Sequence, residues 1–206
     1  NEVAKQAFEI NNIKNVSLYN EGISDKNQNI SFIELPSGYG EISNKSYVEK
    51  KDGLDIINNK KVFVNCKTID SFIEEKKIRS LRLIKVDIDG GEAKVIKGSI
   101  KTIKELSPIY IFEISRNWKL NEPKMLESIK NTLFLFENLG YELYFSTISG
   151  EKIYFLDNKN IFSLGWASKK GKALNFYALK EIDVNKLNKN FISKERNTET
   201  FIKDNS

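Results

Sequence analysis

The sequence of 206 residues contains no histidine, which removes both the commonest general base and the commonest metal ligand of proteins. A single cysteine, Cys66, excludes an internal disulfide and is typical of a reducing compartment, so we expect a cytoplasmic location. No apolar run approaches the roughly 20 residues of a membrane-spanning helix. Acid–base chemistry in this chain would therefore depend on carboxylates, tyrosines or lysines.

Charged residues are numerous but mixed in sign. Lys and Arg number 33 against 28 Asp and Glu, for a net charge of +5, and the lysines are scattered along the chain. Scattered lysines indicate a biased composition more than a nucleic-acid-binding surface, so we predict no nucleic-acid partner. Residues 166–172 combine Trp166 with three lysines, a mixture found where proteins contact RNA. We interpret this segment as a solvated loop.

The length and a hydrophobic content of 40% are sufficient for one buried core. We predict one domain over residues 1–183 and a polar tail over residues 184–206 that frays. The sequence starts at Asn1 within a predicted helix, in which Val3, Ala7 and Ile10 share one face. We therefore expect that Asn1 is not the natural start of the protein.

Periodicity and turn residues predict most of the other elements. Thr68 is a candidate helix N-cap, and Asp70 follows in the first turn, where the helix dipole favours a negative charge. Residues 36–59 form a long connection, either a lid over a binding site or an insertion. We also predict a helix that begins at Pro123 and ends before Gly140, with an apolar stripe of Leu126, Ile129, Leu133 and Phe136. The remaining predicted elements are strands over residues 16–19, 62–65 and 175–179 and a β-hairpin over residues 141–145 and 152–156.

The central feature is an apolar run over residues 81–88, typical of a strand buried on both faces of a parallel sheet. Gly90 and Gly91 then allow a tight turn. Residues 92–106 have helical periodicity, and a second apolar run covers residues 109–114. This succession predicts a right-handed βαβ unit.

Acidic residues follow the first strand of this unit. Asp87 and Asp89 are two residues apart, so within a strand both side chains would leave from one face, and Glu92 opens the helix. Because ligands of open α/β sheets bind at the carboxyl ends of strands, these acids are candidate site residues. For Asp89 and Glu92 the alternative is that they only complement the helix dipole. Lys85 is expected to pair with one of the acids.

The segment KVDIDGGEAKVIKG, residues 85–98, resembles the signature of the FkbM family of S-adenosylmethionine-dependent methyltransferases, roughly Lys-Ile-Asp-Val-Glu-Gly-x-Glu followed by a short helix and Lys/Arg-Gly. Asp89 departs from the usual Glu, and Gly91 replaces a larger residue. The residues that fit are Lys85, Asp87, Gly90, Glu92, Lys97 and Gly98. Further similar segments follow the same order along the chain: residues 15–32, 67–73 and 107–115, with a weaker one at 174–179.

The resemblance implies an α/β fold with a Rossmann-like class I methyltransferase sheet of strand order 3-2-1-4-5-7-6, to which the C-terminal antiparallel hairpin would be added. It also implies S-adenosylmethionine as the cofactor and methylation of a hydroxyl on a sugar, glycan or small molecule. The turn after the third strand, with Glu21, Gly22, Ile23 and Asp25, would line the adenine pocket. An ordinary hairpin turn into residues 30–35 is the alternative for this segment.

Two parts of such a cofactor site are not found in the sequence. Neither the glycine-rich turn after strand one nor the acid after strand two is present, and Gly165 and Gly171 are too far apart to form the turn. We therefore expect an incomplete sheet with the first two strands missing. The resulting edges would be unpaired, so we expect the isolated chain to be marginally stable or to re-pair its strands, to bind the cofactor weakly and to be inactive.

The resemblance assigns roles to four acids. Asp87, at the end of strand four, is the first candidate for contact with the sulfonium or the acceptor. Like charges at Asp89 and Glu92 favour a raised pKa for one carboxyl of the group, which would make it a proton acceptor. Glu113, at the end of the next strand, is the second candidate.

Other classes of protein remain as alternatives. Asp87-Ile88-Asp89 is also a DxD motif, with which many glycosyltransferases bind Mn²⁺, and a non-catalytic remnant or binding module is a third possibility. An EF-hand is excluded because the twelfth position from Asp87 is Gly98, which has no carboxylate. We assign no metal ligands, and neither the acceptor nor the oligomeric state follows from the sequence.

Overall fold

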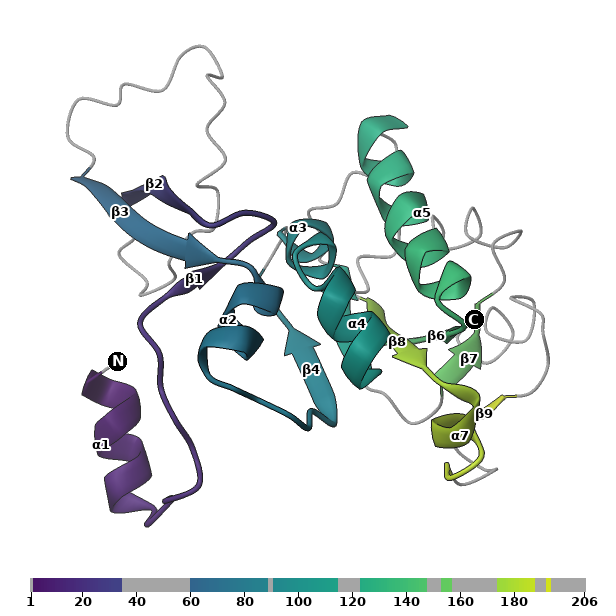
Figure 1. Cartoon of the computed structure of the whole chain (residues 1–206), viewed down its shortest axis with the longest axis horizontal. Helices are drawn as coiled ribbons and strands as arrows, with labels where there is room; N and C mark the ends of the chain where they lie inside the picture. Colours follow the sequence, from purple (N-terminus) through teal and green to yellow (C-terminus); the bar gives the residue numbers. More distant parts are fainter. Residues whose placement is uncertain are drawn as a thin grey trace.

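The computed structural model describes residues 2–34, 60–88, 91–114, 123–147, 153–156, 174–187 and 192–193. Within these residues the chain has a mixed α/β fold with a three-stranded sheet and a six-stranded sheet (Figure 1). The predicted long connection over residues 36–59 and the Trp166–Lys172 segment lie outside the described residues. No helix in the described part of the chain is long and apolar enough to cross a membrane.

The small sheet contains β1 (Gly22–Ile23), β2 (Gln28–Glu34) and β3 (Lys60–Lys67), with β3 in the centre. β1 is parallel to β3, and β2 is antiparallel to it. The strand predicted over residues 62–65 is thus confirmed as part of β3. The hairpin alternative for residues 21–35 is wrong, because β1 and β2 each pair with β3 and not with each other.

The strand predicted over residues 16–19 is wrong. These residues form no strand and run alongside α2 (Ile69–Glu75). The Tyr19 ring packs edge-on against Phe72 of α2, with 4.9 Å between ring centroids, and the Lys76 ammonium lies 5.0 Å from the Tyr19 centroid. Of this segment, Tyr19 therefore packs against a helix instead of pairing in a sheet.

The first helix is confirmed as α1 (Glu2–Ile10), but its apolar face is not buried. Val3 is 80% exposed and Ile10 is 83% exposed. No residue of α1 is buried. The helix consequently adds nothing to the core of the described structure.

The large sheet has the order β4-β5-β8-β6-β7-β9. β4 and β5 are parallel, β8 is antiparallel to both β5 and β6, β7 is antiparallel to β6, and β9 is parallel to β7. The predicted hairpin and the strand at residues 175–179 are confirmed. The strands are β4 (Leu83–Val86), β5 (Ile109–Ile114), β6 (Glu142–Thr147), β7 (Ile153–Phe155), β8 (Leu174–Leu179) and β9 (Ile192–Ser193).

Strand β4 is not buried on both faces, contrary to the prediction. Only Val86 is buried, whereas Leu83 is 44% exposed and the following Ile88 is 42% exposed. The reason is the position of β4 in the sheet: among the described strands it pairs with β5 alone and forms an edge. An apolar sequence specifies a strand, but its burial depends on neighbours that are distant in the sequence.

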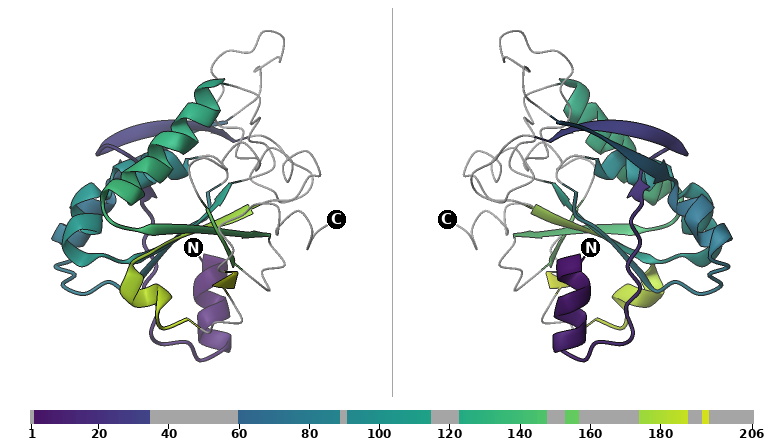
Figure 2. Two further views of the ribbon diagram at one scale, coloured as in Figure 1. Left: turned by 90° about the vertical axis from the view of Figure 1, so that its right-hand side faces the viewer. Right: turned by 90° about the vertical axis from the view of Figure 1, so that its left-hand side faces the viewer.

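One face of the large sheet carries the main core. Register partners across the strands share this face, and the rings of Phe112 and Phe176 stack with 5.4 Å between centroids. The face is covered by α3 (Glu92–Lys97), α4 (Ile100–Leu106) and α5 (Pro123–Asn138), which lie together on one side of the strands (Figure 2). A smaller cluster with Tyr144 and Leu179 lies on the other face, beside α7 (Glu181–Val184).

The single helix predicted over residues 92–106 is wrong, since Gly98 and Ser99 divide it into α3 and α4. The Gly98 carbonyl accepts a hydrogen bond from the Asp70 backbone N–H at 3.1 Å. A Cβ on Gly98 would lie 2.3 Å from the carbonyl oxygen of Ser24. The break therefore results from close contacts with two segments that precede the helix by many residues.

The predicted cap at Thr68 is confirmed, because its hydroxyl accepts a hydrogen bond from the Ser71 N–H at 3.0 Å. The end of α5 is confirmed as well. Gly140 has a φ of +74°, the left-handed conformation that glycine adopts readily. Of the predicted stripe, Leu133 and Phe136 are fully buried.

Ile192 of the predicted tail is 8% exposed and pairs with β7, so this residue belongs to the sheet.

Candidate active site

The side chain of Asp87 lies just beyond the carboxyl end of β4. Its carboxylate accepts a hydrogen bond from the Lys85 ammonium at 2.7 Å, which confirms the predicted pairing of Lys85 with one of the acids. Both side chains are accessible, with exposed fractions of 57% for Lys85 and 45% for Asp87. The hydrogen bond to Asp87 and the charge of that carboxylate raise the pKa of Lys85, and the charge of Glu113 adds to the increase.

Glu113 lies on the same face of the sheet as Lys85. Lys85 is the register partner of Ile111 on β5, and Glu113 follows two residues later, so its side chain leaves from the same side as that of Ile111. Because β4 and β5 are parallel, their carboxyl ends meet at one edge. The structure thus places Asp87 and Glu113 together at the edge where ligands of α/β sheets bind.

Polar residues continue this arrangement onto the antiparallel strands. Asn175 at the start of β8 is the register partner of Glu113, and Ser146 on β6 is the register partner of Asn175. The hydroxyls of Ser146 and Tyr177 are 3.0 Å apart. Sequence reasoning did not find these three residues. The alternation of polar and apolar residues in LNFYAL was the available signal, but the antiparallel register that brings them to Glu113 is not fixed by the sequence.

The other two acids of the motif do not join this group in the described structure. Asp89 lies outside the described residues. Glu92 opens α3, is 1% exposed, and belongs to the helix layer over the opposite face. Among the described residues no group of three His, Cys, Asp or Glu side chains is arranged to hold a metal ion.

The predicted adenine-pocket turn is held by contacts with β3. Glu21 accepts a hydrogen bond from the Lys67 ammonium at 2.9 Å, and the Ser24 N–H donates to the Lys67 carbonyl at 2.8 Å. Gly22 packs so closely on β3 that an added Cβ would lie 2.4 Å from Sγ of Cys66. Ile23 packs against the main core. Packing therefore accounts for Gly22 and Ile23 without a ligand.

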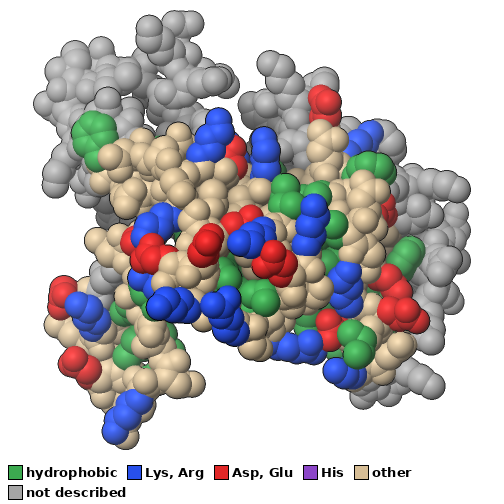
Figure 3. Space-filling view, in the orientation of Figure 1, with side chains coloured by type: hydrophobic (Ala, Val, Ile, Leu, Met, Phe, Trp, Pro, Cys, Tyr) green, Lys and Arg blue, Asp and Glu red, His purple; other side chains and the backbone are tan. Residues whose placement is uncertain are grey.

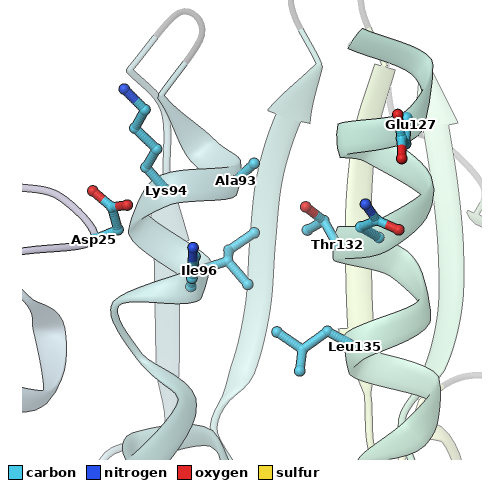
Figure 4. Close-up of a pocket in the computed structure, with 9 residues that line it drawn as sticks. Asp25, Ala93, Lys94, Ile96, Glu127, Thr132 and Leu135 are labelled. Carbon is cyan, nitrogen blue, oxygen red and sulfur yellow. The ribbon is translucent and has the colours of Figure 1, made fainter. Parts of the chain in front are cut away.

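Asp25 has a different environment, because it borders a cavity of about 580 Å³. The cavity lies between α3 and α5, with Asp25 and Lys94 on one side and Thr132 and Leu135 on the other (Figure 4). Ile96 and Leu135 supply apolar lining. The remaining lining residues are Ala93, Lys97, Glu127 and Asn131.

The turn at Asp25 and the helix after Asp87 are neighbours in space although they are far apart in the chain. A Cβ on Gly98 would lie 2.3 Å from the Ser24 carbonyl oxygen and 3.3 Å from the Asp25 Cα. The turn is therefore packed directly against the end of α3. Residues 21–25 and 85–98, which the family resemblance assigned to one site, are thus in contact at Gly98.

The Methyltransferase FkbM domain model matches residues 3–143. The chain belongs to the FkbM methyltransferase family. The match includes the turn at residues 21–25, the Lys85–Asp87 pair and Glu113, and ends within β6, so Asn175 and Tyr177 of β8 lie beyond it. No curated protein matches the sequence.

The surface of this FkbM-family chain carries charges of both signs. On the face shown in Figure 3, Lys and Arg side chains are interspersed with Asp and Glu side chains. This distribution agrees with the scatter of lysines along the sequence.

Proposed function

We propose that this FkbM-family chain takes part in the S-adenosylmethionine-dependent methylation of a hydroxyl on a sugar, a glycan or a small molecule. Asp87 is the residue assigned to contact with the methyl donor or the acceptor. The observation that carries the proposal is the placement of Asp87 and Glu113 on one sheet face at the carboxyl ends of two parallel strands. Asp25, which borders the cavity, is assigned with the rest of the turn at residues 21–25 to the adenine side of the same site.

The residues present are suited to such a donor. When bound, S-adenosylmethionine supplies a methyl group on a positively charged sulfur. The Asp87 carboxylate is 45% exposed and can face a cation from the end of β4. Alignment of the acceptor oxygen can lower the barrier by several kcal/mol, roughly 7 or more in favourable cases. We propose Glu113 as the second candidate for contact with the donor or the acceptor; a positioned base that accepts the hydroxyl proton would contribute about 10²- to 10⁴-fold.

The topology of the large sheet supports a Rossmann-like class I arrangement. The order β4-β5-β8-β6, with β8 antiparallel to its neighbours, corresponds to strands four, five, seven and six of the order expected for the family. In that arrangement strand one would lie beside β4. The exposed Leu83 and Ile88 at this edge support our inference that strands equivalent to one and two belong there.

Without those strands the cofactor would lack its glycine-rich turn, so we propose that the isolated chain binds it weakly and does not turn over. The glycosyltransferase alternative is less well supported. It requires the Asp87 carboxylate as a metal ligand, and a lysine ammonium lies 2.7 Å from that carboxylate.

Calorimetric titration of the 206-residue chain with S-adenosylmethionine tests this proposal. We expect an affinity weaker than micromolar that decreases further in Asp87→Asn and is unchanged in Glu74→Gln, a control at an acid that is 77% exposed on α2. In a form that includes the two additional strands, Asp87→Asn should abolish methyl transfer and leave the unfolding transition intact. Micromolar binding by the chain alone would contradict the incomplete sheet, and near-normal turnover in Asp87→Asn would remove the assignment of Asp87.

A further inference from the structure

Lys85 lies beside carboxylates on two neighbouring strands. Its ammonium donates to Asp87 at 2.7 Å, and its register partner Ile111 stands two residues before Glu113 on the same face of β5. The hydrogen bond and the charge of Asp87 are the main causes of the raised pKa of Lys85, and the charge of Glu113 adds a smaller contribution. Lys85 is thus a single cation with an acid on its own strand and a second acid on the adjacent one.

The ion pair between Lys85 and Asp87 is of a kind that breaks easily, so that Lys85 can pair with another acceptor. The two side chains are 57% and 45% exposed, and exposed ion pairs are weak because water screens them and two flexible side chains lose freedom. A lysine has a long, flexible stem and a compact ammonium, so it can turn between nearby acceptors without movement of the backbone. The cost of separating Lys85 from Asp87 is therefore small.

We propose that Lys85 is a positioning residue that pairs with Asp87 when no cation is bound and turns to Glu113 when the positive sulfur of the methyl donor occupies Asp87. The proposal rests on the function proposed above, in which Asp87 faces the donor. It adds a role for Lys85, which neither contacts the acceptor nor moves a proton.

This exchange makes Lys85 a competitor of the cationic donor and not of the neutral product. In the reaction the methyl carbon bonds to the acceptor oxygen, the carbon–sulfur bond breaks, and its electron pair stays on sulfur as a neutral thioether. The Asp87 carboxylate then has no cationic ligand, so Lys85 returns to it. Lys85 thereby reduces the preference of the site for donor over product, and Glu113 limits that reduction by receiving the displaced ammonium.

The ratio of the dissociation constants of S-adenosylhomocysteine and S-adenosylmethionine tests this directly, since the two ligands differ in the charge and methyl group at sulfur. Ligand-observed NMR at millimolar ligand on the 206-residue chain detects the weak binding expected here. In Lys85→Met the ratio should rise by about two- to fivefold in favour of the cationic donor. In Glu113→Gln it should fall, because the displaced ammonium has lost its second acceptor. Lys85→Arg, which keeps the charge, should restore a ratio close to that of the unmodified chain.

The outcomes separate the inference from the proposed function. If both ligands bind and Lys85→Met leaves the ratio unchanged, or if Glu113→Gln shifts it in the same direction as Lys85→Met, the exchange is contradicted and the methyltransferase assignment stands. If neither ligand binds to the unmodified chain or to any variant at millimolar concentration, the role of Lys85 in this chain is contradicted, and the assignment of Asp87 is decided by turnover of Asp87→Asn in the form with the two additional strands.

Discussion

The carboxylate of Asp70 on α2 holds the first turn of α4 through Thr102. One carboxylate oxygen accepts hydrogen bonds from the Thr102 backbone N–H at 2.8 Å and from the Thr102 hydroxyl at 2.7 Å, and the other accepts from the Lys101 N–H at 3.1 Å. The two backbone N–H groups are among those that the start of a helix leaves without an intrahelical partner. An acid in the first turn of one helix is therefore the cap of another, and it fixes α4 in the layer that covers the core.

Asp70→Ala should lower the free energy of unfolding by about 2 kcal/mol, because two backbone N–H groups of α4 lose their acceptor. Urea denaturation followed by circular dichroism measures the change. Glu74→Ala on the same helix is the matched control, since the Glu74 side chain is 77% exposed and its ion pair with Lys101 is long, at 4.0 Å. For this control we expect the free energy of unfolding to fall by less than about 0.5 kcal/mol. Equal effects of the two substitutions would contradict the capping role of Asp70.

Gly98→Ala tests the contact between α3 and the turn at Asp25. The new Cβ would lie 2.3 Å from the Ser24 carbonyl oxygen, and that neighbour is backbone, so the two segments must move apart. We expect a loss of about 1–3 kcal/mol in unfolding free energy and changed NMR amide shifts at Ser24 and Asp25. Lys97→Ala, at an exposed position one residue earlier, should leave both quantities nearly unchanged. A Gly98→Ala variant with the stability of the unmodified chain would show that this contact is looser than described.

A fall in pH should lower the free energy of unfolding through protonation of Glu75. Hydrogen bonds from Lys67 and then from Lys76 lower the pKa of Glu75 from 4.5 to about 2. A carboxyl whose pKa is lowered by folding stabilises the fold above its unfolded pKa, and this contribution disappears as the pH falls from about 4.5 through about 2. Glu75→Gln should therefore have a flatter dependence of stability on pH in this range, measured by urea denaturation at a series of pH values. Lys67→Met should flatten the profile in the same way, and a profile of Glu75→Gln parallel to that of the unmodified chain would contradict the prediction.

Local signals in the sequence were sufficient for much of the fold. The cap at Thr68, the end of α5 at Gly140 and the β6–β7 hairpin each depend on residues that are close in sequence, and all three are as predicted. Of the candidate site, the strand that ends in acid and glycine was recognisable as a local pattern, whereas the turn at residues 21–25 was assigned only through the resemblance to the family.

Features that depend on distant partners were not predictable. The break at Gly98 requires Ser24 and Asp70, which are 74 and 28 positions away in the sequence. The exposure of β4 depends on which strand lies beside it, and Tyr19 of the predicted strand at residues 16–19 packs on Phe72 of α2 instead. The polar residues Asn175 and Ser146 reach Glu113 only through an antiparallel register that no short segment encodes.

The central claim is that the turn at residues 21–25 and the end of β4 together contact the methyl donor. Mapping of backbone amide shifts by NMR during a titration of the 206-residue chain with S-adenosylmethionine tests it most directly. We predict that the shifts concentrate in residues 21–25 and 86–93 and are greatly reduced in Asp87→Asn. Shifts confined to other elements, or shifts of the same size in Asp87→Asn, would contradict the claim.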